Sequence, residues 1–285
     1  MDSPASPKSS DLMAWMTTGM LVAAPIILLM LFITGGWKLP PSARLAAWRL
    51  PVELGALIFA TTILLGGLGS WAAIRVYGGE GTTGIARTGL ATLGMYGGSL
   101  IPLIGLAFLW PHLPRPVGAE KPLPTLLAAG LGAVGCLFGL PLIETVAFLG
   151  TELQAWLQGA PGSPIAHVTL DLLVNSAPGG WWWAIALGAM LAAPLVEEIL
   201  YRGIIQQALR RMKVGRWWAI LFTSGIFVLM HLPALPDETL AGSLGALFMA
   251  SIIFGWIREW TGRLAASISA HVLFNVFNLL LALSM

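Results

Sequence analysis

Residues 194–203 read PLVEEILYRG, and they lie inside an apolar run that extends from about residue 182 to about residue 209. A run of this length can form a helix that crosses a bilayer, which needs about 20 residues. Two adjacent carboxylates and a guanidinium are costly in lipid, so such groups face a protein interior or a water-filled cavity and are associated with function. The motif Glu197-Glu198-x-x-x-Arg202 is therefore the first candidate for a functional site.

The composition of the whole chain is that of a membrane protein. Of its 285 residues, 57 % are hydrophobic and 10 % are charged, whereas about a quarter of the residues of a soluble domain are charged. The mean hydropathy is +0.82. The apolar runs are continuous and lack the alternation of an outer-membrane barrel, so they predict α-helices. We expect an all-α, polytopic bundle that is integral to the membrane.

Eight apolar runs are long enough to cross a membrane, or nearly so. They cover about residues 12–35, 52–76, 89–110, 124–149, 182–209, 216–233, 240–260 and 264–284. We expect residues 1–180 to form N-terminal scaffold helices followed by an outer loop, 150–180, and residues 181–285 to hold the chemistry within the same membrane domain. The outer loop contains 166–174, a candidate interfacial helix, and His167, which we expect to be exposed.

The charged loops predict the orientation of the chain. Four loops that fall on one side of the eight runs carry the basic residues Lys38, Arg44, Arg49, Arg115, Lys121, Arg210, Arg211, Lys213, Arg216, Arg258 and Arg263. The loops 150–180 and 234–239 carry acidic residues and no lysine or arginine. The positive-inside rule makes the basic side cytoplasmic and leaves both termini outside, most simply in the cell (inner) membrane.

The composition argues against a nucleic-acid partner, an internal disulfide and a cleaved signal peptide. The net charge is +2 and its basic residues are spread through short loops, so nothing points to a nucleic-acid partner. The single cysteine, Cys136, excludes an internal disulfide. The N-terminus has no clear basic region and cleavage site, so the first apolar run is expected to be a retained helix.

Helical spacing divides the three charged residues of the central motif. Glu198 and Arg202 are four residues apart and lie on one face of a helix, where they can form a supporting ion pair. Glu197 is rotated by about 100° from Glu198 and points elsewhere. Glu197 is therefore the carboxylate left available as a general base.

Two histidines and an asparagine lie at the same expected depth as Glu197. Glu197 is roughly 20 Å along its helix from the basic boundary, His231 is roughly 22 Å, and His271 and Asn275 are roughly 12–18 Å. His271 and Asn275 are four residues apart, and so share a face that also carries Ser267 and Asn278. Polar residues that only hold helices together are the alternative interpretation, but such residues need not agree in depth.

These residues resemble the three motifs of the CPBP family of intramembrane proteases, which includes the type II CAAX prenyl endopeptidases and bacteriocin-processing homologues. The motifs are Glu197-Glu198-x-x-x-Arg202, Phe227-x-x-x-His231 and His271-x-x-x-Asn275, and the resemblance covers about residues 181–285. It implies that Glu197 and His231 activate a water molecule, and that His271 and Asn275 stabilise the oxyanion. Glu198 and Arg202 would match the supporting part of the first motif.

The resemblance implies a glutamate-type mechanism without a metal, although the family was long regarded as metal-dependent. Glu197, His231 and His271 are also a donor set that zinc accepts. The zinc-protease spacing of two histidines four apart with a glutamate between them is absent from the sequence. We therefore expect no cofactor, with zinc as the alternative.

Two other functions are compatible with the sequence. One is a membrane immunity or scaffold homologue without protease activity, and the other is a proton-coupled transporter that uses Glu197 and His231. Transporters often consist of two related halves, and the two halves of this chain show no such relation. A protease would act on a membrane-tethered peptide or protein within the lipid bilayer, with an active site open toward the cytoplasmic side.

Overall fold

The computed structural model describes residues 9–38, 50–79, 81–113, 123–159 and 167–284. Within these ranges the chain is all-α, without a strand, and eight helical spans are long and apolar enough to cross a membrane. The predicted fold class and the number of spans are confirmed. The spans cover Ala14–Thr34, Val52–Tyr77, Gly84–His112, Thr125–Gln158, Gly180–Arg211, Arg216–Ala234, Asp237–Thr261 and Leu264–Ser284.

The N-terminal half contains four long helices, which are α1 (Ser9–Thr34), α2 (Val52–Tyr77), α3 (Gly84–Leu109) and α4 (Thr125–Gln158). Helices α2 and α3 form a tight pair because glycines remove the side chains between them. A Cβ atom on Gly98 would collide with the backbone of Leu65, and one on Gly69 would collide with the backbone of Gly94. These are close approaches of the kind that small residues permit between membrane helices.

The C-terminal half is built from four spans. The fifth span is a continuous helical rod made of α6 (Gly180–Leu187), η3 (Gly188–Ala192), α7 (Ala193–Glu198), η4 (Ile199–Ile205) and α8 (Gln206–Arg211). It is followed by α9 (Arg216–His231), the short 3₁₀ turns η5 (Leu232–Ala234) and η6 (Asp237–Thr239), α10 (Leu240–Thr261) and α11 (Leu264–Ser284).

The predicted outer loop is shorter than expected, because α4 continues to Gln158. We expected the loop to begin at about Gly150, but this glycine lies within the helix and packs against the backbone of Ala241 on α10. The helix ends at Gly159, which adopts the left-handed conformation (φ 70°) that favours glycine at a helix C-terminus. A short helix is present in the expected segment as α5, which covers Val168–Val174, while residue 166 lies outside the described residues.

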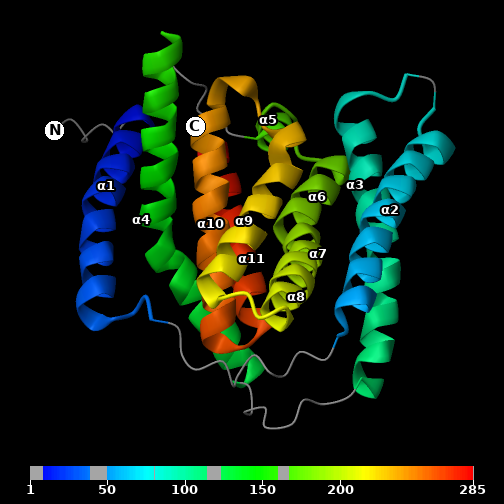
Figure 1. Cartoon of the computed structure of the whole chain (residues 1–285). Coiled ribbons are helices and arrows are strands. Elements are labelled where there is room, and N and C mark those ends of the chain that lie inside the picture. Colours follow the sequence, from blue (N-terminus) through cyan, green and yellow to red (C-terminus); the bar gives the residue numbers. More distant parts are fainter. Residues whose placement is uncertain (1–8, 39–49, 80, 114–122, 160–166, 285) are drawn as a thin grey trace.

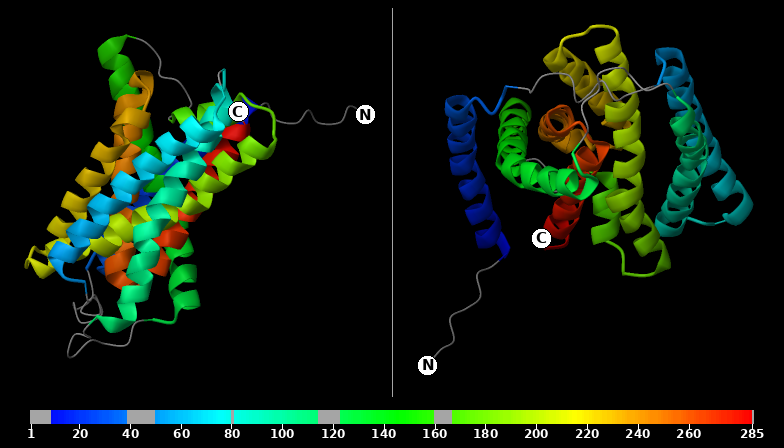
Figure 2. Two further views of the ribbon diagram at one scale, coloured as in Figure 1. Left: turned by 90° about the vertical axis from the view of Figure 1, so that its right-hand side faces the viewer. Right: turned by 90° about the horizontal axis from the view of Figure 1, so that it is seen from below.

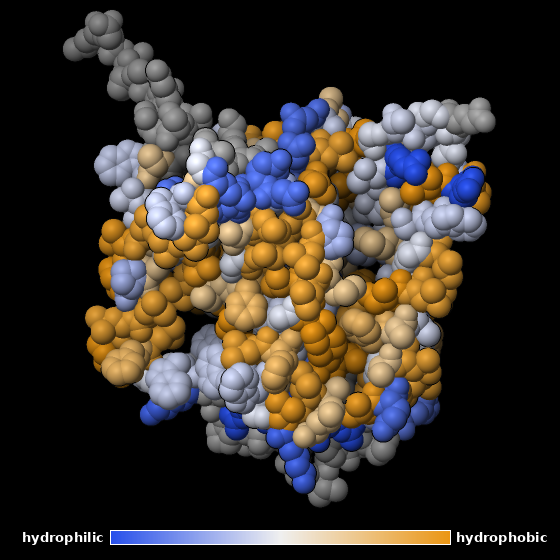
Figure 3. Space-filling model, turned by 45° about the horizontal axis from the view of Figure 1, so that its top comes forward, coloured by the Kyte–Doolittle hydropathy of each residue, from blue (hydrophilic) through white to orange (hydrophobic). Residues whose placement is uncertain are grey.

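The catalytic candidates lie in the middle of the bundle. Helix α4 packs against α10 and α11, and α3 packs against α6, so the C-terminal helices lie between α1 and α4 on one side and α2 and α3 on the other (Figures 1 and 2). The start of α1 and the end of α11 lie at the same end of the molecule (Figure 1). Figure 3 shows a belt of hydrophobic side chains between two hydrophilic ends, as expected for a protein that spans a bilayer.

Candidate active site

The Glu197-Glu198 pair lies between two wide helical turns. Residues 188–192 and 199–205 form π turns, which our expectation of a regular α-helix did not include. The first precedes Pro194, which has no N–H group and would clash with the carbonyl group four residues earlier in a regular α-helix. The extra residue of a π turn relieves such a clash, and π turns are frequent at functional sites.

Glu198 and Arg202 form a buried ion pair. Arg202 Nη1 lies 2.6 Å from Glu198 Oε1, and neither side chain is accessible to solvent. Arg202 Nη2 donates to Ser251 Oγ at 2.7 Å and to the Ser251 carbonyl at 3.0 Å. The rings of Phe227 and Phe254 flank the guanidinium at 5.0 and 5.4 Å, so aromatic faces replace water around this cation.

Glu197 points away from this pair and toward both histidines. Its Oε2 lies 3.7 Å from His231 Nε2 and 3.9 Å from His271 Nε2. The side chain of Glu197 is 22 % exposed and that of His231 is 19 % exposed, whereas His271 is buried. The structure therefore brings together residues from the fifth, sixth and eighth spans at one depth, around a carboxylate that solvent can reach.

The hydrogen bond at Nδ1 of each histidine determines whether its Nε2, which faces Glu197, is a donor or an acceptor. His231 Nδ1 lies 2.7 Å from the Phe227 carbonyl, and His271 Nδ1 lies 3.0 Å from Glu198 Oε1. Both partners are acceptors, so each Nδ1 donates its hydrogen. In its neutral form each ring then presents an Nε2 lone pair. A carboxylate oxygen and two lone pairs converge on a small space that a hydrogen-bond donor such as water would occupy.

Asn275 lies next to this cluster but contacts a different group. Its Nδ2 donates to the carbonyl of Ala189 at 2.8 Å, inside the first π turn. In a π turn that carbonyl would bond to the N–H group five residues later, which is the position of Pro194. The asparagine therefore replaces a backbone donor that proline lacks.

A buried polar seam, made of Gln206, Arg210 and Glu259, continues from the site and was not predicted from the sequence. Gln206 and Arg210 come from the fifth span, and Glu259 comes from α10. Gln206 Nε2 donates to Glu259 Oε1 at 3.0 Å, and Arg210 Nε lies 3.8 Å from Glu259 Oε2. Gln206 and Arg210 continue the four-residue spacing that begins with Glu198 and Arg202. Ser251 and Glu259 on α10 face this row of residues. This continued spacing is the signal that could have predicted it.

Two residues, Arg258 and His167, are less exposed than predicted from the sequence. Arg258, which we assigned to a basic loop, is buried near the end of α10, because the helix continues to Thr261. His167, which we expected to be exposed, is only partly exposed and accepts a hydrogen bond from the Thr169 N–H as the N-cap of α5. Burial and, to a smaller extent, the charge of His231 together lower the pKa of His167 to about 4.

The donor types around Glu197 suit zinc, and the separations of its carboxylate from the two histidines can be compared with those of a zinc site. Two ligands of one tetrahedral zinc ion, each about 2.1 Å from the metal, are about 3.4 Å apart. Both separations from Glu197 Oε2 exceed this distance. Across the part of the chain that the structure describes, no group of three or more His, Cys, Asp or Glu residues has the geometry to hold a metal ion.

The comparison with protein families identifies the segment that holds this cluster. Residues 179–277 match the family model described as type II CAAX prenyl endopeptidase Rce1-like. This match to an Rce1-like domain supports a CPBP family intramembrane protease. Comparison with curated proteins and with solved structures gave no match.

The Rce1-like domain contains every residue of the cluster, from Ala189 to Asn275. It covers the fifth, sixth and seventh spans and most of the eighth. A domain of this family indicates a CAAX-type endopeptidase that acts within a membrane.

Proposed function

We propose that this chain hydrolyses peptide bonds of membrane-associated substrates by a glutamate-type mechanism. The observation that supports this most directly is the convergence of Glu197 Oε2 with the Nε2 atoms of His231 and His271. A water molecule in that space can donate one hydrogen to Glu197 and the other to His231. It is then oriented with a lone pair free to attack a carbonyl carbon.

The proposed reaction begins with proton transfer from this water to Glu197. The water oxygen forms a bond to the scissile carbonyl carbon, and the carbonyl π electrons move onto the carbonyl oxygen. Glu197 then returns the proton to the amide nitrogen as the carbon–nitrogen bond breaks. One product ends in a carboxyl group and the other in an amine, so no further reactant is needed.

We assign stabilisation of the oxyanion to His271 and Asn275. His271 Nδ1 already donates to Glu198, so His271 can donate from Nε2 only when it carries a proton on both nitrogens. Asn275 retains one N–H that its bond to Ala189 does not use.

Cleavage by matched variants tests the assignment. Purified protein, Glu197→Gln and His231→Ala would be assayed on a panel of membrane-tethered peptides. Each peptide would be offered with and without a prenyl group, because the matched family is described as prenyl endopeptidases. We expect each variant to lose about 10²–10⁴-fold in cleavage rate, which is the typical contribution of a general base.

Glu144→Gln is the control for Glu197→Gln, because Glu144 is a partly buried glutamate on α4, outside the Rce1-like domain. It should cleave like the unaltered protein. Equal loss in Glu144→Gln and Glu197→Gln would contradict the assignment. Absence of cleavage in the unaltered protein across the panel would favour a scaffold, and proton-coupled uptake into vesicles would favour a transporter.

Chelation tests the metal-free form of the proposal. We propose that an active preparation retains its activity after treatment with a strong chelator and dialysis, because Glu197 can activate water without a metal. Loss of activity that added zinc restores would establish zinc on Glu197, His231 and His271 instead.

A further inference from the structure

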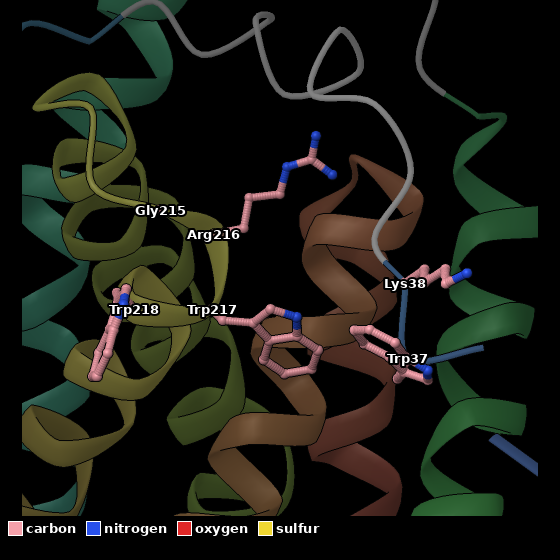
Figure 4. A pocket seen from close by; sticks show the side chains of 6 residues that line it. All are labelled: Trp37, Lys38, Gly215, Arg216, Trp217 and Trp218. Carbon is pink, nitrogen blue, oxygen red and sulfur yellow. The ribbon is translucent and has the colours of Figure 1, made fainter. Parts of the chain in front are cut away.

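A cavity of about 580 Å³ lies between the end of α1 and the start of α9 (Figure 4). It is lined by Trp37, Lys38, Gly215, Arg216, Trp217 and Trp218. The Lys38 side chain points away from Arg216, so the two cations do not converge on one ligand (Figure 4). None of the six residues belongs to the cluster around Glu197. A further residue of the proposed active site must therefore come from the helices that pack around the fifth span.

Helix α3 brings Tyr96 against the fifth span. It packs along α6, η3 and α7 of this span (Figure 1). The Tyr96 ring lies on Gly188, where an added Cβ atom would come within 3.4 Å of the ring atom Cε2 and would collide with Thr92. Glycine at position 188 therefore lets α3 approach closely, and Tyr96 packs against the backbone at the start of the first π turn.

The first π turn brings Gly188 to the side of the helix that carries Glu197. In a regular α-helix, the nine residues from 188 to 197 turn through about 900°, which would put the two on opposite sides. The Ala193 N–H donates to the Gly188 carbonyl five residues earlier, so the π turn takes up one extra residue. About a quarter of a turn then separates Gly188 from Glu197. Tyr96, which lies on Gly188, therefore approaches the side of the span that carries Glu197.

The Tyr96 hydroxyl faces Glu197 without bonding to it. The negative charge of Glu197 acts on this hydroxyl, and the tyrosine is only partly buried. No residue in the part of the chain that the structure describes forms a hydrogen bond with the hydroxyl. Gly188 and Glu197 are roughly 13 Å apart along the axis, and the Glu197 side chain leans toward the helix N-terminus and hence toward Tyr96. The hydroxyl thus keeps its hydrogen for a group that lies between it and the carboxylate.

The proposed reaction needs such a donor at the carbonyl oxygen of the substrate. His271 can donate from Nε2 only as an imidazolium, because its Nδ1 donates to Glu198, and Asn275 has one N–H left. A phenol donates its hydrogen without a change of charge. Donors that are already in place where negative charge develops give the largest stabilisation of a tetrahedral intermediate, and tyrosine is one of the side chains that serve in this way.

We propose that the Tyr96 hydroxyl donates a hydrogen bond to the carbonyl oxygen of the scissile peptide bond and, together with Asn275, stabilises the oxyanion. This inference rests on the proposed protease function and adds to it a donor from the N-terminal half of the chain. Tyr96 lies outside residues 179–277, which match the family model. The phenol keeps its hydrogen throughout the reaction, so the proton that Glu197 takes from water still goes to the amide nitrogen.

The variant Tyr96→Phe tests the proposal, because it removes the hydroxyl and keeps the ring on Gly188. Cleavage of a membrane-tethered peptide would be measured for the unaltered protein, Tyr96→Phe and Glu197→Gln. We expect the kcat of Tyr96→Phe to fall by about 10²–10³-fold, the usual loss on removing one oxyanion donor, with KM nearly unchanged. Its unfolding temperature in detergent should equal that of the unaltered protein, because the hydroxyl has no partner among the described residues.

Tyr201→Phe is the matched control. The charge of Glu197 also acts on the Tyr201 hydroxyl, but this ring packs against Phe59 and Phe227 and is only 3 % exposed, so a substrate does not reach it. The control should cleave like the unaltered protein, and equal losses in the two tyrosine variants would overturn the proposal. An unchanged kcat in Tyr96→Phe beside a loss in Glu197→Gln would overturn the role of Tyr96 alone. Absence of cleavage by the unaltered protein would overturn the protease function and this inference together.

Discussion

At the scale of single residues, the Glu198–Arg202 pair is the most consequential feature of the site. Both charges are fully buried, so Arg202 depends on Glu198 and Ser251, and Glu198 depends on Arg202 and His271, for the interactions that water would otherwise supply. Glu198 also holds His271 through its Nδ1. The pair thus sets the orientation of a proposed catalytic ring and contributes to the packing of three spans.

Arg202→Ala should therefore reduce both stability and activity. Removing one partner of a buried ion pair leaves an uncompensated charge and costs about 3–5 kcal/mol. Glu197→Ala should leave stability nearly unchanged, because Glu197 is partly exposed. Thermal unfolding in detergent measures the difference, and a larger loss in Glu197→Ala than in Arg202→Ala would mean that the two glutamates have exchanged roles.

His167 gives the molecule a predicted dependence on pH. Its folded-state pKa of about 4 lies below the ordinary value of 6.5, so the unfolded chain binds more protons between these two values. The contribution of His167 to stability is fully present above pH 6.5 and is lost as the pH falls toward 4.

The substitution His167→Asn should flatten this part of the stability profile. Asparagine keeps an acceptor for the N-cap of α5, so only the titration is removed. Melting temperatures measured from pH 7 to pH 4 would show a smaller decline in the variant than in the unaltered protein. Parallel curves would show that other groups cause the decline.

At the scale of the helical element, the π turn before Pro194 gives Asn275 a structural role in addition to its proposed role in stabilising the oxyanion. Its amide donates to the Ala189 carbonyl, which has lost its backbone donor to the proline. Asn275→Ala should therefore destabilise the protein by about 1 kcal/mol, the lower end of the cost of an unpaired carbonyl, because Ala189 is only partly buried.

The double variant Pro194→Ala/Asn275→Ala tests whether Asn275 stabilises the protein by bonding to the Ala189 carbonyl. Alanine at 194 supplies an N–H group that can bond to the Ala189 or Met190 carbonyl, so part of the lost stability should return. Chemical denaturation of the two single variants and the double variant gives the coupling energy. Additive losses would contradict the assignment of Asn275 as the partner of this carbonyl.

At the scale of the whole molecule, the basic ends of the spans predict which side faces the cytoplasm. Arg210 and Arg211 end α8 and Lys213 lies in the loop that follows, at the end of the bundle opposite the start of α1 (Figure 1). Four residues used for the orientation, Arg44, Arg49, Arg115 and Lys121, lie outside the described residues. We propose that the end with the α8–α9 loop is cytoplasmic.

Cysteine labelling tests this orientation, and the buried Cys136 supplies a quiet background. In intact cells a membrane-impermeant maleimide should label Glu238→Cys, at the opposite end, and should label Lys213→Cys only after permeabilisation. Both residues are exposed, so access to the reagent decides the result. Labelling of Lys213→Cys in intact cells would reverse the orientation.

The sequence by itself determined the fold class, the eight spans and the separation of Glu197 from the Glu198–Arg202 pair. These follow from hydrophobic length and from the angle between successive residues of a helix, which are local properties. The common depth of Glu197, His231 and His271 was also predicted, because helical rise per residue is nearly constant.

Only the tertiary structure decided which atoms meet. The two π turns, the bond from Asn275 to Ala189, the burial of Arg258 and the seam around Glu259 depend on contacts between spans that are distant in sequence. The continuation of α4 past Gly150 is of the same kind, because close packing against α10 requires a glycine that otherwise suggests a loop. Helix periodicity gives the direction of a side chain, but its partner depends on how the helices pack.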